Sequence, residues 1–175
     1  MAVVRRASFA LVLALLLAAG FSRGETSASA AVTGSAPIPV KEYVARADRL
    51  CLSVAKEVLA LKLQQRLAAV QAKGGSERTR MRATANLLGE QLAAVSRFER
   101  RLAALPLPRG EERFGRRVRA AITQSAILLR AGVAALRAGE ARRAERALLG
   151  YRDASLRSAR LARDHGGFRY CGSGA

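Results

Sequence analysis

Apolar residues recur at spacings of three and four through nearly all of the chain after residue 40, and this period limits what the chain can fold into. The clearest stretch lies between two turn signals, Ser76 and Pro106. Its apolar residues are Met81, Ala85, Leu88, Leu92, Val95, Phe98, Leu102 and Leu105. Alternating steps of three and four place side chains on one side of an α-helix, whereas a strand requires a period of two. No strand-like alternation occurs, so the period predicts an all-α protein.

Glycine and proline interrupt this period at three places and divide it into four helices. Lys73-Gly74-Gly75 ends a first helix that we expect to begin near Val40, because glycine is a poor helix-interior residue. Leu105-Pro106-Leu107-Pro108 ends the second helix and Ala138-Gly139 ends the third. The fourth is expected over residues 140–164. Four amphipathic segments with short connections favour an up-down-up-down four-helix bundle.

The first and fourth helices carry different apolar stripes. The first is expected to bury Val40, Val44, Ala47, Cys51, Val54, Val58, Leu61, Gln65 and Ala68. The stripe of the fourth helix is weaker and rich in small residues such as Ala144 and Ala162, which indicates a close approach to another helix or a partly covered face.

The two cysteines, Cys51 and Cys171, are expected to close the bundle with a disulfide. In an up-down-up-down bundle the start of the first helix and the end of the fourth lie at the same end. Cys51 lies about three turns into the first helix, and Cys171 follows Gly166-Gly167 on a tail able to fold back. Two cysteines this far apart lack the C-x-x-C spacing that metal or redox sites favour.

The N-terminus has the pattern of a cleaved secretory signal. Arg5 and Arg6 precede an apolar run over residues 7–21, which is shorter than the roughly 20 apolar residues of a membrane-spanning helix. Cleavage is expected after Ala28-Ser29-Ala30, with a cut near Ala19-Gly20 as the alternative. We therefore expect a signal peptide over residues 1–30, a flexible lead segment over 31–39 and a bundle domain over 40–175, in a secreted, extracytoplasmic protein.

The chain is strongly basic, with 31 Lys and Arg against 13 Asp and Glu and a formal net charge of +18. Residues 31–175 keep 28 basic and 12 acidic residues, a net charge of +16. Such a field attracts anionic surfaces. The same arginine-rich and alanine-rich usage also follows from a GC-rich genome, so the charge has two explanations at this point.

Several short motifs resemble a loose group of uncharacterised exported proteins of high-GC Gram-positive bacteria. The resemblance rests on residues 43–51, the Leu105-Pro106-Leu107-Pro108 turn, residues 136–140 and residues 167–172. Many members of that group look like lipoproteins. Here Phe21 stands where the lipidated cysteine would be, so the resemblance implies export without a lipid anchor. It implies no activity.

The chain lacks the residue patterns of the common enzyme classes. It has a single histidine, His165, and no G-x-S-x-G, P-loop or G-x-G-x-x-G motif. No glutamate has a histidine three residues later, which excludes the di-iron bundle pattern. We expect His165 to end a helix, where a partly cationic ring complements the helix dipole. The sequence thus predicts a protein that is not an enzyme and holds no metal or cofactor.

Two functions remain compatible with these patterns. The first is binding of an envelope protein, a lipid surface or an anionic envelope polymer through a basic face, without sequence-specific recognition of nucleic acid. The candidate anion-binding residues are Arg97, Arg100, Arg101, Arg113, Arg116, Arg117 and Arg119. The alternative is a carrier of haem or a small apolar ligand within the bundle. Its candidate ligand residues are Tyr43, Tyr151, His165 and Tyr170.

Overall fold

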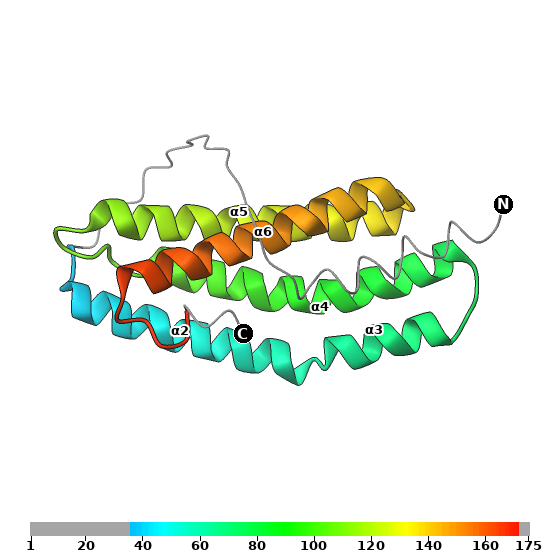
Figure 1. The fold of residues 1–175 in the computed structure, drawn as a ribbon, viewed down its shortest axis with the longest axis horizontal. Coiled ribbons are helices and arrows are strands. Elements are labelled where there is room, and N and C mark those ends of the chain that lie inside the picture. The colour runs from blue at the N-terminus through cyan, green and yellow to red at the C-terminus, as the bar shows by residue number, and fades with distance from the viewer. Residues whose placement is uncertain (1–35, 172–175) are drawn as a thin grey trace. The chain divides into compact units, whose positions relative to one another are not determined.

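A computed structural model describes residues 36–171, and this part of the chain is all-helical. Its helices are α2 (Val40–Ala60), α3 (Leu63–Ala72), α4 (Glu77–Ala104), α5 (Glu112–Ala138) and α6 (Ala141–His165). Figure 1 shows α2 and α3 running one way, α4 returning, α5 running forward and α6 returning. The predicted up-down-up-down bundle is confirmed. The expected signal peptide, residues 1–30, lies outside the described residues.

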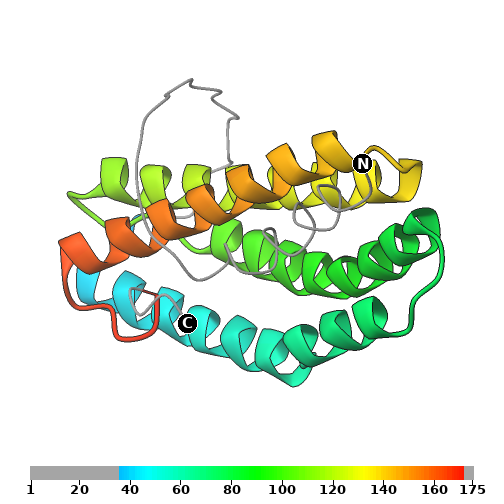
Figure 2. The ribbon, with the colours of Figure 1, turned by 45° about the vertical axis from the view of Figure 1, so that its right-hand side comes forward.

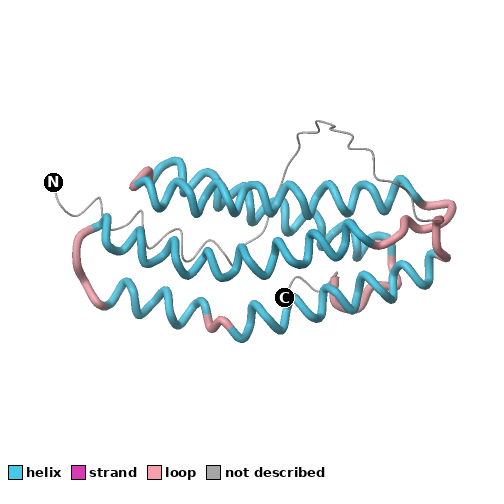
Figure 3. Tube along the Cα trace, turned by 180° about the vertical axis from the view of Figure 1, so that it is seen from behind, coloured by secondary structure: helices cyan, strands magenta, loops and turns pink. Residues whose placement is uncertain are grey.

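The first predicted helix is in fact two helices, and this corrects the sequence interpretation. Lys62 adopts a left-handed backbone conformation with φ 47° between α2 and α3, visible as a short loop in Figure 3. The break rotates the second piece, so that Leu67 is buried while the predicted stripe residues Gln65 and Ala68 are exposed. Arg66 pairs with Glu90 of α4 through contacts of 2.6 and 2.7 Å. Burial of Leu67 and this ion pair hold α3 on α4.

The other helix ends follow their local chemistry. The Ser76 hydroxyl caps α4 by accepting the Thr79 N–H at 3.2 Å. Leu105 is extended, as expected before a proline, and α4 stops at Ala104. Gly139 ends α5 in the left-handed conformation, with φ 81°. These boundaries agree with the predicted turns.

Among the described helices, α5 and α6 share the most extensive packing, and small residues line the face of α6 that is buried. The buried residues of α6 are Ala144, Ala147, Ala154, Ala159 and Ala162. Gly132 of α5 leaves no room for a side chain, because a Cβ atom there would lie 2.7 Å from Cδ2 of Leu148 on α6. In turn α5 packs on α4, and α4 packs on α2 and α3 (Figures 1 and 2).

The end of the bundle that holds both ends of the described chain has its own apolar cluster. Tyr43, Ala47, Leu102 and Val118 form its buried centre, and Phe168 from the tail after α6 packs against them. The last residues of the lead segment are also tied here. The Ile38 N–H donates to the Leu107 carbonyl at 3.0 Å, and the Arg109 N–H donates to the Ile38 carbonyl at 2.7 Å. Ordered contacts therefore begin slightly before the expected start at Val40.

Candidate functional site

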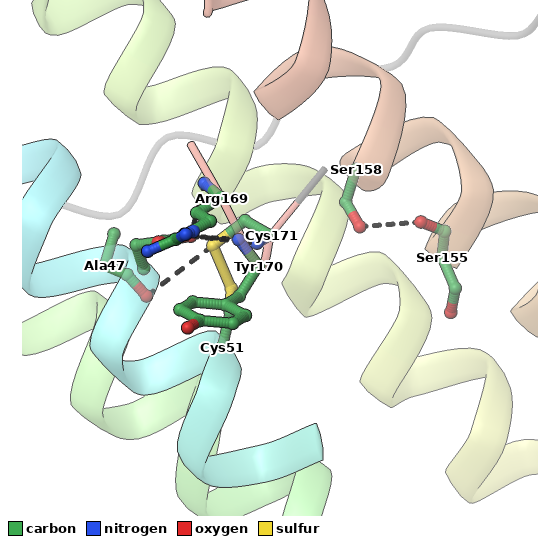
Figure 4. Close-up of a disulfide and its surroundings, with 8 residues drawn as sticks. Ala47, Cys51, Ser155, Ser158, Arg169, Tyr170 and Cys171 are labelled. Atoms are coloured by element: carbon green, nitrogen blue, oxygen red, sulfur yellow. Dashed lines mark hydrogen bonds between the residues drawn. A yellow bond between two sulfur atoms is a disulfide. The ribbon is translucent and has the colours of Figure 1, made fainter. Parts of the chain in front are cut away.

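The disulfide between Cys51 and Cys171 is present, as predicted, with Cα atoms 5.2 Å apart. Gly166, with φ 79°, ends α6, and the chain then crosses to α2 (Figures 1 and 2). We call residues 166–171 the tail. Figure 4 shows the tail meeting α2 at the disulfide. The bond joins the tail that follows α6 to α2, near the end of the bundle where α2 begins and α6 ends.

Asp48 holds the tail by its backbone. Its Oδ1 accepts the N–H groups of Arg169, Tyr170 and Cys171 at 3.1, 2.7 and 3.0 Å. Three successive N–H groups converging on one anionic oxygen form the kind of concave anion site found in turns. Asp48 lies three residues before Cys51, so both side chains share one face of α2. We call Asp48, its three amide donors and the disulfide the clasp.

Sequence reasoning did not identify the role of Asp48. The residue appeared only inside the motif of residues 43–51, with no function attached. A signal was nevertheless present, because an acidic residue three positions before a paired cysteine stands on the same helical face as the thiol. The sequence does not show that residues 169–171 point their backbone N–H groups at the Asp48 carboxylate.

His165 fastens the same end of the bundle in a second way. It is the last residue of α6, as predicted, and its Nε2 contacts the Glu111 carboxylate at the start of α5. Its Nδ1 lies 3.0 Å from the Gly166 carbonyl oxygen, and its ring stacks on Phe114 with centroids 4.0 Å apart. Both ring nitrogens thus face acceptors, which favours the doubly protonated ring.

The pKa of His165 follows from these contacts. Burial lowers the pKa of the ring, but hydrogen bonds to the Gly166 carbonyl and the Glu111 carboxylate, with the charge of Glu111, outweigh burial and raise it. These contacts therefore favour the protonated form of His165, and the ring links the end of α6 to the start of α5.

The structure does not bring the four candidate ligand residues of the carrier hypothesis into one site. Tyr43 is fully buried, and burial raises its pKa against the opposing charge and hydrogen bonding of Arg119. Tyr151 accepts a hydrogen bond from Gln91 of α4 at 3.0 Å, and burial raises its pKa too. Tyr170 is 40% exposed on the tail.

The candidate anion-binding arginines fall into two groups. Arg97 pairs with Glu57 at 2.8 Å, and Arg119 is half-buried and donates to the Leu105 carbonyl at the end of α4. These two are engaged within the fold. The remaining five are exposed on the last turns of α4 and the first turns of α5, and they are Arg100, Arg101, Arg113, Arg116 and Arg117. Antiparallel packing of α4 and α5 places these turns at the same end of the bundle.

A shallow hollow lies between α2 and α4, and its volume is about 10 Å³, close to the space that one water molecule needs. Both apolar and polar side chains line it, among them Phe98, Arg97 and Glu57. Pockets for small ligands usually hold about 300–1,000 Å³, so this hollow is too small for haem.

Residues 36–171 contain no group of three or more His, Cys, Asp and Glu side chains placed to hold a metal ion. Within that range, no helix has the length and apolar character to cross a membrane. The chain matches no protein-family model, and no curated protein or solved structure shows significant similarity to it.

Proposed function

We propose that the protein is an exported, non-enzymatic helical bundle that binds an anionic polymer of the cell envelope. The observation that carries this proposal is the group of exposed arginines where α4 ends and α5 begins. Arg100, Arg101, Arg113 and Arg117 are exposed and have no ion-pair partner among residues 36–171. We call these four residues the basic patch.

Charge and rigidity support this function together. Unpaired guanidinium groups bind phosphate and carboxylate oxygens without first breaking an internal ion pair, so no existing contact opposes the ligand. The two helices that carry the patch pack directly on each other. Their side chains therefore start from a fixed backbone, which lowers the ordering cost of binding. Export, for which the N-terminal sequence pattern argues, would bring this surface to the anionic polymers outside the cell.

Binding to polyphosphate, measured over a salt series, tests the proposal. The slope of log K against log salt reports how many anionic groups the protein neutralises, with roughly 0.7–0.9 of a unit for each contact in nucleic acids. Replacement of all four patch arginines by glutamine is expected to weaken binding strongly and to reduce this slope. Neutral dextran serves as the uncharged polymer, and it should not bind.

A matched variant controls for net charge. Arg78, Arg82, Arg142 and Arg146 are exposed on the first turns of α4 and α6, at the opposite end of the bundle. Their replacement by glutamine removes the same four charges. Equal losses in the two variants would show that net charge, and not the basic patch, drives binding. No binding at low salt by the unmodified protein would refute the function itself.

A further inference from the structure

The break between α2 and α3 opposes what the local sequence favours. Residues 57–73 contain no glycine or proline, and nearly all of them are strong helix formers such as leucine, alanine and glutamine. Yet Lys62 has φ 47°, and among residues 36–171 it is the one non-glycine residue with a positive φ. A left-handed conformation is disfavoured for a residue with a side chain. The local sequence therefore does not account for the break.

The helix that follows the break is lightly attached to the bundle. Leu67 is the one fully buried residue of α3. Arg66 forms an exposed ion pair with Glu90 of α4. Both ends of α3 are exposed, and its far end leads into Gly74, which has a positive φ and open space around it. Figure 3 shows α3 as a short helix between two loops.

A continuous helix over residues 40–72 is the conformation that the apolar period predicts. In such a helix the stripe of α2 passes through Gln65 and Ala68. In the structure these two residues are exposed, and Leu67, which lies off the stripe, is buried instead. The two conformations therefore turn different faces of the α3 segment toward α4. One satisfies local helix propensity, and the other buries an apolar side chain.

We propose that α2 and α3 form a conformational switch with two states. In the docked state α3 lies on α4 beyond the break, as the structure shows. In the straight state α2 and α3 form one helix, and Lys62 adopts the right-handed conformation. Straightening separates Arg66 from Glu90, and it uncovers the part of α4 on which Leu67 rests. Two packings of one segment with similar free energies are the basis of such a switch.

Anions act on this switch through Arg66. Its guanidinium is paired with Glu90 in the docked state and unpaired in the straight state. A ligand shifts an equilibrium toward the state that it binds more tightly. An anion bound to the free guanidinium therefore favours the straight state, and salt that screens the exposed pair acts in the same direction. The switch does not involve the basic patch, so its failure would leave the proposed function intact.

NMR spectroscopy of the full chain distinguishes the two states at single residues. The Cα chemical shift of Lys62 reports whether its backbone is left-handed or right-handed. In the docked state the N–H groups of residues 63–65 begin a helix and have no partner within it, so they exchange rapidly with solvent. In the straight state they donate within a continuous helix and exchange slowly.

Loss of the buried anchor should straighten the helix. Leu67→Ala removes that anchor and inserts the strongest helix former, so it should raise the ratio of straight to docked state by roughly 30-fold or more. Lys62 should then be right-handed, with slow exchange at residues 63–65. Lys62→Gly added to Leu67→Ala should lower the ratio by roughly 5- to 30-fold, because glycine adopts the left-handed conformation without steric cost.

The ion pair has a matched control. Added to Leu67→Ala, Arg66→Ala should raise the ratio further, by up to roughly 5-fold. Arg97→Ala breaks a similar pair with Glu57, between α4 and α2, and should leave the ratio unchanged. Added salt should raise the ratio in Leu67→Ala and should have no effect once Arg66 is also replaced.

A left-handed Lys62 with rapid exchange at residues 63–65 in Leu67→Ala would overturn the inference. Rapid exchange throughout residues 63–72 would overturn it as well, because α3 would then unfold and not join α2. Equal effects of Arg66→Ala and Arg97→Ala would show that the ion pair does not control the switch. Circular dichroism and a non-reduced mass of each variant check that the other helices and the disulfide remain.

Discussion

Replacement of Asp48 by alanine tests how much the clasp contributes to the stability of the fold. The change removes the acceptor of three backbone N–H groups, two in exposed contacts and one in a partly buried contact. A buried hydrogen bond to a charged group contributes about 1.5–3 kcal/mol, and water replaces much of this at the exposed amides. We therefore expect the free energy of unfolding of the oxidised protein to fall by about 1.5–3 kcal/mol for the set as a whole.

Urea unfolding followed by circular dichroism measures this loss, and two further variants calibrate it. Asp48→Asn keeps a neutral acceptor oxygen, so it should lose about half as much, because charge-assisted bonds are roughly twice as strong as neutral ones. Glu42→Ala removes the same charge from the same helix but breaks a half-exposed pair with Arg46. Such a pair contributes about 0.2–0.5 kcal/mol.

The same contact should also affect the equilibrium between thiols and disulfide. If Asp48 holds the tail on α2 before oxidation, its loss leaves Cys171 less often near Cys51. In glutathione redox buffers, the equilibrium constant for oxidation should fall by up to roughly 10- to 100-fold in Asp48→Ala, at 1.4 kcal/mol for each factor of ten. An Asp48→Ala variant no less stable than Glu42→Ala, with an unchanged oxidation equilibrium, would refute the reasoning.

Three other changes have expected outcomes. Replacement of Cys51 and Cys171 by serine should lower the free energy of unfolding by about 4–5 kcal/mol, because the disulfide closes a loop with a sequence separation of 120 residues and so restricts the unfolded chain. Urea unfolding of the double variant measures this loss. A loss under about 1 kcal/mol would contradict an origin in the entropy of the unfolded chain. Contacts raise the pKa of His165, so protonated His165 stabilises the fold fully below its unfolded pKa of about 6.5. This contribution to the free energy of unfolding is lost as pH rises through the higher folded pKa. Urea unfolding between about pH 5.5 and 8.5 should show this decline, and His165→Gln should remove it. Gly132→Ala should destabilise the protein by about 1–3 kcal/mol, because the added Cβ clashes with Leu148 of α6. Gly89→Ala should stabilise it by about 0.5–1 kcal/mol, because the added Cβ meets only the far end of a flexible arginine. Thermal unfolding measures both variants, and equal changes in their melting temperatures would contradict the packing argument.

The helices and their order could be predicted from the sequence because the information is local. A period of three and four residues defines a helical face whatever the helix packs against. Gly139 and Pro106 end helices through their own backbone restrictions, which also require no distant partner. The disulfide was predictable as well, since the topology and the position of the two cysteines leave a single pairing.

The break at Lys62 could not be read from the sequence. Residues 59–63 contain no glycine or proline, and the left-handed conformation of Lys62 is disfavoured locally. It accompanies the burial of Leu67 and the ion pair of Arg66 with Glu90 on α4. Whether those partners lie within reach depends on the packing of two helices and not on the residues around the break.

The same distinction applies to the candidate site. The sequence alone determined that the chain forms helices, that they alternate in direction and that the chain carries excess positive charge. Tertiary structure decided which polar groups are used internally: Arg119 against the Leu105 carbonyl, His165 against Glu111, and Asp48 against the amides of residues 169–171. A helical period depends on neighbours within four residues, whereas these contacts join groups separated by 14 to 123 residues, and the folded chain alone brings them within hydrogen-bonding distance.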